Sequence, residues 1–200
     1  MMENMKLGFM GVHNSFSEKA SKVFAKNNGM ADISESQLLP LVDAFHVRDA
    51  LVAGDITYGV VAIRNSITGM VAETEEAFRN MDICILDEFA LPIHQCFFKL
   101  PGTPIENITT VASHPQALMQ TRNTRQQLVG KKIELTMEDT ALSAKMLSDG
   151  KLSPDTAVVC SLEAGLMNGL ELIRENIEDK SDNKTYFRMI CLADQRGMAA

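Results

Sequence analysis

Short apolar runs alternate with helical patterns along almost the whole of this 200-residue chain. A strand is predicted at 7–10 and a helix at 17–28, where Gly29 ends it. Few folds accommodate such an alternation, because it implies a parallel or mixed sheet with helices on both faces. The sequence therefore predicts the α/β class.

The alternation continues to the end of the chain. Further strands are predicted at 38–41, 58–63, 83–86, 108–112, 132–136, 157–160 and 185–192. Further helices are predicted at 44–53, 74–79, 115–128, 140–147 and 162–168. Asp43 is the expected cap of the helix at 44–53, and residues 100–104 are the expected loop.

Composition excludes several classes of function. An apolar content of 46% can fill a core, while a net charge of −7 argues against binding to nucleic acid. Residues 1–6 do not resemble a signal peptide, and no apolar run approaches the roughly 18 residues of a membrane span, so we expect a cytoplasmic protein.

The four cysteines give no sign of a metal or redox site. Cys84, Cys96, Cys160 and Cys191 are widely spaced, without a Cys-x-x-Cys pair, and we expect buried reduced thiols. The sequence also lacks a Gly-rich phosphate loop, a nicotinamide fingerprint and a metal-binding cluster. We therefore expect no cofactor and no metal.

Polar segments stand at the ends of several predicted elements. Asn65-Ser66 follows a strand, residues 113–116 (Ser-His-Pro-Gln) open a helix, and residues 183–187 (Asn-Lys-Thr-Tyr-Phe) open the last strand. Asn65-Ser66 could be a turn or a helix cap, Ser113 a helix cap, and Thr185 a structural residue that opens a strand, while for Asp139-Thr140 a cap and a ligand contact are equally open. Short polar side chains and backbone N–H groups at such places can also bind a carboxylate.

Taken in chain order, these segments resemble the Glu-Asn-Ser, Ser-His-Pro and Asn-x-Thr-Arg-Phe motifs of the prephenate dehydratase family. Residues 11–18 resemble the family's Gly-Pro-x-Gly-Thr-Phe-Ser-x opening, without its Pro and its second Gly. Residues 138–144 resemble its Ser-Thr-Ala-x-Ala-Ala helix start, and residues 176–179 its Asn-Ile-Gln-Asp segment. The resemblance depends on order and spacing, because each short motif is weak alone.

The resemblance implies a fold of two α/β lobes with a cleft between them, like a type II periplasmic binding protein. The whole chain, 1–200, would be one catalytic domain, with one lobe formed by 1–78 and 176–200 and the other by 79–175. The chain would cross between lobes at 73–87 and again at 170–180. The family's phenylalanine-binding ACT domain and a chorismate mutase segment are not expected in this chain, whereas a homodimer or tetramer is.

The resemblance also implies an activity. Prephenate would lose carbon dioxide and water to give phenylpyruvate, a step of phenylalanine biosynthesis that needs no cofactor. Thr185 would donate a proton or a hydrogen bond to the leaving hydroxyl. The expected substrate-binding residues are Arg64, Asn65, Ser66, Ser113, His114, Gln116, Thr140, Tyr186 and Phe187.

Two charged positions depart from the family pattern. Arg64 stands where the family has Glu, and Tyr186 stands where it has Arg. Our hypothesis is that Arg64 crosses the cleft to the space vacated at Tyr186 and preserves a cation for the dianionic substrate. Arg188 is a second candidate, because residues two apart on a strand share a face.

Three alternatives stay open. The substrate could be arogenate, which carries an amino group in place of the keto group. The chain could be a non-aromatising prephenate decarboxylase, although those enzymes lack the threonine that Thr185 matches. It could also be a binding protein or sensor that performs no chemistry.

Overall fold

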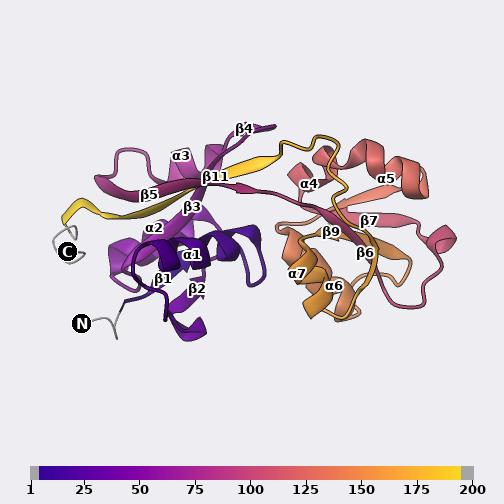
Figure 1. Cartoon of the computed structure of the whole chain (residues 1–200), viewed down its shortest axis with the longest axis horizontal. Helices are drawn as coiled ribbons and strands as arrows, with labels where there is room; N and C mark the ends of the chain where they lie inside the picture. The colour runs from indigo at the N-terminus through magenta and orange to yellow at the C-terminus, as the bar shows by residue number, and fades with distance from the viewer. Residues whose placement is uncertain (1–4, 195–200) are drawn as a thin grey trace. The chain divides into compact units, whose positions relative to one another are not determined.

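The computed structural model describes residues 5–194, which form two compact α/β units (Figure 1). The first unit contains the chain up to Pro92 and from Lys184 onward, and the second unit is Ile93–Asn183. The expected crossings at 73–87 and 170–180 are therefore placed too early. The reason is that two long strands, β5 (Ile83–Pro92) and β11 (Lys184–Leu192), pair along their whole length before the chain leaves the first unit.

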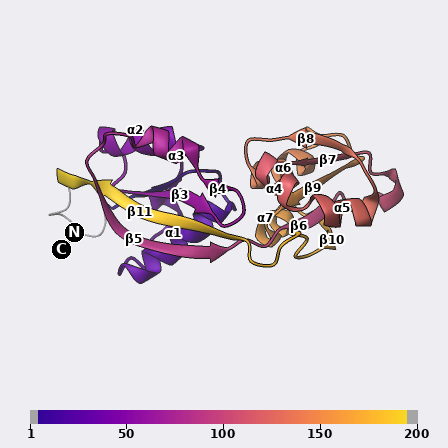
Figure 2. The same ribbon diagram turned by 90° about the horizontal axis from the view of Figure 1, so that it is seen from above.

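The described residues of the first unit form one sheet with the order β2-β1-β3-β11-β5, and β4 pairs with β3. The remaining strands are β1 (Leu7–Phe9), β2 (Leu38–Pro40), β3 (Tyr58–Asn65) and β4 (Gly69–Met70). β1 is parallel to β2 and β3, whereas β11 is antiparallel to β3 and β5. Figure 2 shows β11 and β5 side by side, and β5 is an edge of the sheet.

Helices cover both faces of this sheet, as the alternation predicts. α2 (Ala44–Ala53) and α3 (Ala72–Ala77) lie on one face, and α1 (Phe16–Asn27) lies on the other (Figure 2). A short 3-10 helix, η2 (Glu35–Gln37), precedes β2. Asp43 caps α2 as predicted, because its carboxylate accepts a hydrogen bond of 2.8 Å from the His46 N–H. The core between α2 and the sheet includes Val47, Leu51 and Ile190.

The second unit contains a five-stranded sheet with the order β10-β6-β9-β7-β8. Its strands are β6 (Cys96–Lys99), β7 (Thr110–Ser113), β8 (Ile133–Thr136), β9 (Thr156–Cys160) and β10 (Glu171–Arg174). β7 is parallel to β8 and β9, whereas β6 is antiparallel to β9 and β10. The carboxyl ends of β7 and β8 therefore meet at one edge of the sheet.

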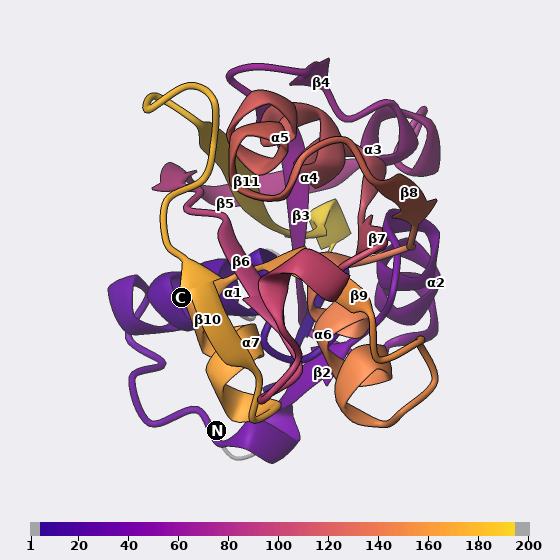
Figure 3. The ribbon, with the colours of Figure 1, turned by 90° about the vertical axis from the view of Figure 1, so that its right-hand side faces the viewer.

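Four α-helices of the second unit lie on the two faces of its sheet. α4 (Pro115–Gln120) and α5 (Arg122–Val129) lie on one face, and α6 (Thr140–Ser148) and α7 (Leu162–Met167) on the other (Figures 1 and 3). A 3-10 helix, η3 (Ile105–Asn107), follows the predicted loop. The single helix predicted at 115–128 is interrupted at Thr121, whose hydroxyl donates to the Ala117 carbonyl at 2.7 Å.

Candidate functional site

Thr185 and Asn65 face each other across β11 and β3. They are register partners, and the Asn65 Nδ2 donates a hydrogen bond of 3.1 Å to the Thr185 Oγ1. Asn65 is itself buried and held, because its Oδ1 accepts from the N–H groups of Ile67 and Thr68 at 2.9 and 3.1 Å. The Thr185 hydroxyl oxygen thus accepts a bond from a fixed amide, and its own proton remains for another acceptor.

Ser66 holds the same end of the strand pair. Its N–H donates to the Lys184 carbonyl at 2.8 Å, and its Oγ accepts from the Lys184 N–H at 2.9 Å. These two bonds continue the ladder one residue beyond Thr185 and Asn65. Ser66 therefore fixes the backbone from which Thr185 projects.

Arg64 and Tyr186 are also cross-strand partners on β3 and β11. The Arg64 guanidinium carbon lies 4.0 Å from the centroid of the Tyr186 ring, which is a cation–π contact. Our hypothesis that Arg64 crosses a cleft is therefore wrong, because the two residues belong to adjacent strands of one sheet. The cation does lie over position 186, but it comes from the neighbouring strand.

Arg188 has a different environment. Its Nε donates to the Glu88 Oε2 on β5 at 2.6 Å. It also lines a groove of about 310 Å³ with mostly apolar neighbours, which include Ile63, Phe78 and Ile190. Arg188 thus has a carboxylate partner, whereas Arg64 stacks on an aromatic ring at the Thr185 end of the strand pair.

Phe187 and Ser113 are buried and make internal contacts. Phe187 is 2% exposed and stands opposite Ala62 and Phe89, so it packs in the first unit. Ser113 is 0% exposed, and its hydroxyl donates to the Val159 carbonyl at 2.6 Å. The cap of α4 is His114 rather than Ser113, because the His114 Nδ1 accepts from the Gln116 N–H at 3.2 Å.

The ends of β7 and β8 bring the second unit's motifs together. Ser113 is in register with Thr136, so His114 and the Asp139-Thr140 pair follow adjacent strands. Asp139 is the cap of α6, with its Oδ1 accepting from the Ala141 and Leu142 N–H groups at 2.6 and 3.1 Å. Burial raises the pKa of the Asp139 carboxyl, against the lowering effect of these two N–H bonds and of His114.

This cap leaves Thr140 as the half-buried first residue of α6. When Asp139 is ionised, its carboxylate occupies the helix end at which an anionic ligand would be stabilised. The structure therefore assigns the cap to Asp139, and a ligand contact of Thr140 stays a prediction.

Asn14 and Glu18 are residues that the sequence motifs did not single out. Asn14 has a φ of 68°, in the left-handed region that Asn tolerates better than most residues, and it stands where the family opening has its second Gly. Its N–H donates to the buried Glu18 carboxylate, which also contacts Lys22 at 3.2 Å and His13 at 3.3 Å. Burial alone would raise the pKa of Glu18, but these partners outweigh burial and lower it.

Asn183 begins the threonine motif but belongs to the second unit. Its side-chain amide donates to the Gln120 Oε1 at 2.9 Å, and its carbonyl accepts from the Ile93 N–H at 2.9 Å. The motif at 183–187 therefore spans the boundary between the two units. Its first residue anchors the strand that carries Thr185.

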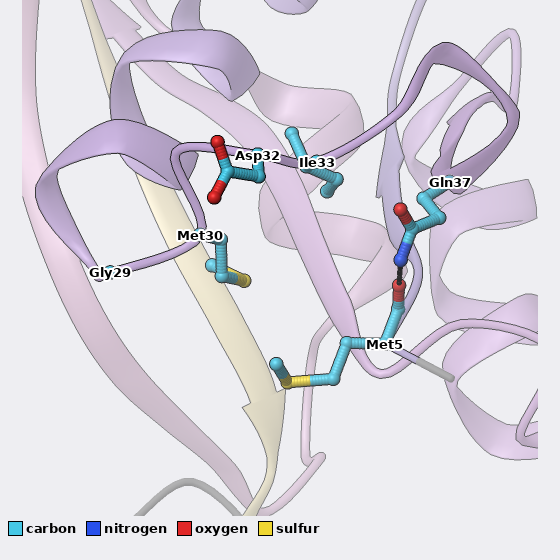
Figure 4. A pocket seen from close by; sticks show the side chains of 6 residues that line it. All are labelled: Met5, Gly29, Met30, Asp32, Ile33 and Gln37. Carbon is cyan, nitrogen blue, oxygen red and sulfur yellow. Dashed lines mark hydrogen bonds between the residues drawn. The ribbon is translucent and has the colours of Figure 1, made fainter. Parts of the chain in front are cut away.

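One small cavity in the first unit contains none of the predicted site residues (Figure 4). It measures about 100 Å³, and the Gln37 side-chain amide at its edge donates to the Met5 carbonyl at 2.9 Å. Within residues 5–194, no three or more His, Cys, Asp or Glu side chains are grouped so that they could hold a metal ion. The same residues contain no helix long and apolar enough to cross a membrane.

Comparison with known proteins places this chain among the dehydratases of aromatic amino acid biosynthesis. A family model described as prephenate dehydratase matches residues 7–195. Arogenate dehydratase/prephenate dehydratase 6, a chloroplastic protein of Arabidopsis thaliana, is 30% identical over 188 residues, which cover 94% of this chain and 43% of that protein. This chain therefore spans less than half the length of that relative.

Two solved structures have a similar fold. Prephenate dehydratase from Arthrobacter aurescens, in complex with L-Phe, gives a TM-score of 0.81 at 24% identity over 94% of this chain and 60% of that chain. A periplasmic substrate-binding protein of an ABC transporter from Coxiella burnetii gives 0.54 at 9% identity over 98% of this chain and 88% of that chain. The predicted α/β fold of the periplasmic-binding-protein type is confirmed.

Proposed function

This chain belongs to the prephenate dehydratase family, and from that premise we propose that it converts prephenate to phenylpyruvate by loss of carbon dioxide and water. One observation carries the proposal. The Thr185 hydroxyl is held by a buried amide, that of Asn65, in the segment that matches the family's threonine motif. Arogenate, which differs in its side chain, is the alternative substrate.

A hydroxyl held in this way can donate a proton or a hydrogen bond, and that donation is what the proposed reaction needs from it. In the reaction the bond from the ring to the leaving carboxylate breaks, and its electron pair enters the ring as the bond to the hydroxyl breaks. The leaving hydroxyl needs a proton or a hydrogen bond, which the Thr185 O–H supplies. The Asn65 amide donates to the Thr185 oxygen and so stabilises negative charge that develops on it.

Arg64 is the residue that we assign to a carboxylate of the substrate. A bidentate charge-assisted contact with a carboxylate needs two donors in one plane, which a guanidinium provides. Arg64 is exposed at the end of the sheet where Thr185 lies, and the ring of Tyr186 limits the orientations of its side chain. The cation that the family carries at position 186 would thus be supplied from β3.

The remaining assignments follow the family resemblance. The predicted role of His114, Gln116 and Thr140 in substrate binding rests on the resemblance alone, while Ser113 in the second unit and Phe187 in the first act through internal contacts. We further propose a cytoplasmic homodimer or tetramer that uses no cofactor. The net charge of −7 supports a partner other than nucleic acid.

The test is turnover of prephenate and, separately, of arogenate by the wild type, Thr185→Val and Thr185→Ser. Valine keeps the β-branched shape without the hydroxyl, whereas serine keeps the hydroxyl. We expect an aromatic product from the wild type, its loss in Thr185→Val by about 10²–10⁴-fold, and partial recovery in Thr185→Ser. Thr110→Val, which is half-buried like Thr185 and lies at the opposite end of β7 from Ser113, is the matched control.

The products separate the proposal from its alternatives. Phenylpyruvate from prephenate supports the proposal, and phenylalanine from arogenate alone would assign the other substrate. Substrate consumption without an aromatic product would instead identify a decarboxylase. Saturable binding without consumption would show a binding protein and overturn the proposed activity.

A further inference from the structure

The four cysteines, although far apart in the sequence, form two cross-strand pairs. Cys84 on β5 stands directly opposite Cys191 on β11, and Cys96 on β6 stands directly opposite Cys160 on β9. All four are thiols in this structure. Opposed residues of antiparallel strands project to the same face with Cα atoms about 4.5–5.5 Å apart, which lies within the range that a disulfide spans.

The two pairs differ in their freedom to move. Within residues 5–194, β5 is an edge strand of the first sheet whose one strand partner is β11, and Cys84 is half-buried. In the second sheet β6 and β9 each have a neighbouring strand on both sides, and Cys96 and Cys160 are 2% and 0% exposed. An oxidant can therefore reach Cys84 more readily than either cysteine of the second pair.

The hydrogen-bonding pattern of β5 and β11 shows why strand mobility decides whether a disulfide can form. The Ala193 N–H donates to the Asp82 carbonyl at 3.1 Å, so Cys84 and Cys191, two residues further in, form a hydrogen-bonded pair. Such pairs have the wider Cα separation of about 5.5 Å, and their Cβ atoms must approach for a disulfide to form. An edge strand can make that adjustment, whereas two interior strands are fixed from both sides.

Thiol reactivity also favours oxidation of Cys84 over oxidation of Cys96 or Cys160. The thiolate is the form that attacks an oxidant, and burial suppresses it. Burial raises the pKa of Cys96 to about 11, and it raises the pKa of Cys160 as well. The second pair is thus both rigid and unreactive.

We propose that Cys84 and Cys191 form a redox-modification site, at which a peroxide converts the two thiols into an intrachain disulfide while Cys96 and Cys160 stay reduced. The Cys84 thiolate attacks one peroxide oxygen, the O–O bond breaks, and the released hydroxide leaves as water once protonated. The Cys191 sulfur then attacks the Cys84 sulfenic acid, the S–S bond forms, and the hydroxyl leaves with the Cys191 proton as a second water. The two thiols lose two electrons, and hydrogen peroxide gains them.

The disulfide would change the first unit in a defined way. It would fasten the edge strand β5 to β11, the strand that carries Thr185, and it would close a loop that contains the whole second unit. A cross-link across so long a loop restricts the unfolded chain strongly. Oxidation would therefore raise the thermal midpoint of the first unit, and dithiothreitol would reverse the rise.

The experiment treats the folded wild-type chain with hydrogen peroxide, blocks remaining thiols with iodoacetamide under denaturing conditions, and maps peptides without reduction by mass spectrometry. We expect a cross-linked peptide pair containing Cys84 and Cys191, with Cys96 and Cys160 recovered as alkylated thiols. Cys191→Ser should abolish the cross-link and leave a Cys84 sulfenic acid that dimedone traps. Cys160→Ser, the matched control in the other pair, should leave the cross-link unchanged.

Three results would overturn the proposal. One is a Cys96–Cys160 cross-link that forms as fast as the Cys84–Cys191 cross-link in the folded chain. Another is a Cys84 that oxidises to sulfinic acid or forms only intermolecular disulfides. The third is a Cys84–Cys191 cross-link that appears only after denaturation. The wild-type peptide map decides all three without any variant that could misfold.

Discussion

At the level of single residues, the cation assigned to the substrate's carboxylate is held by an aromatic ring. The Arg64 guanidinium lies over the Tyr186 ring, and the ring offers no competing negative charge. An acidic partner would neutralise the guanidinium, as Glu88 does for Arg188. Tyr186 thus orients the cation and leaves its hydrogen-bond donors for a ligand.

Replacement of Arg64 tests this arrangement. We expect Arg64→Gln to lose a charge-assisted contact of about 1.5–3 kcal/mol, which is roughly ten- to hundredfold in kcat/KM. Tyr186→Phe keeps the ring and should change kcat/KM little, whereas Tyr186→Leu should cost about 0.5–1 kcal/mol. Steady-state kinetics and substrate titration measure these effects. An Arg64→Gln variant that binds and turns over substrate like the wild type would remove Arg64 from the site.

Sequence reasoning can propose site residues but not their contacts. Asn65 and Thr185 could be proposed from motifs 120 residues apart, while the hydrogen bond between them depends on the register of β3 and β11. The same register places Arg64 over Tyr186, and it includes a bulge after Tyr186 that no local pattern indicates. Register follows from long-range pairing, so a local reading cannot supply it.

At the level of elements, most strands and helices were predictable because their apolar periodicity and caps are local. The strands β4, β6 and β10 were missed. β4 has two residues, and neither Cys-Phe-Phe-Lys in β6 nor Glu-Leu-Ile-Arg in β10 alternates apolar and polar residues with the period of a strand. β5 was predicted to end at residue 86 because Asp87 and Glu88 interrupt its apolar run. As an edge strand β5 can carry such charges, and Glu88 pairs there with Arg188.

The start of α1 leads to a prediction about pH. Glu18 has a lowered pKa in the folded chain, so its ionised form stabilises the fold. That stabilisation is present above the ordinary value near 4.5 and is lost as pH falls through the lowered folded value. Glu18→Gln should therefore lower the urea midpoint at pH 7, and the difference from the wild type should shrink below pH 4.5. A difference that is constant across this range would contradict the assigned role of Glu18.

At the level of the whole molecule, the two units differ in how the chain builds them. The second unit is one continuous segment, Ile93–Asn183, whereas the first unit needs β11 from the far end of the chain. β11 is an interior strand between β3 and β5, so the first unit cannot complete its sheet without it. A fragment that ends at Pro92 should therefore remain unfolded.

The register of β5 and β11 shows how the first unit could be completed without the second. Lys184 stands directly opposite Pro92, so the two strands are already arranged as the arms of a hairpin. The next pair, Ile93 and Asn183, is hydrogen-bonded through the Ile93 N–H and the Asn183 carbonyl, so an Asn-Gly turn in place of residues 94–182 would connect the arms in the type I′ geometry that two-residue hairpins favour. We expect this shortened chain to unfold cooperatively in urea, and residues 93–183 alone to do the same. The fragment that ends at Pro92 is the control that lacks β11. If the hairpin-closed chain were as disordered by circular dichroism as that fragment, the first unit would require more than its own strands to fold.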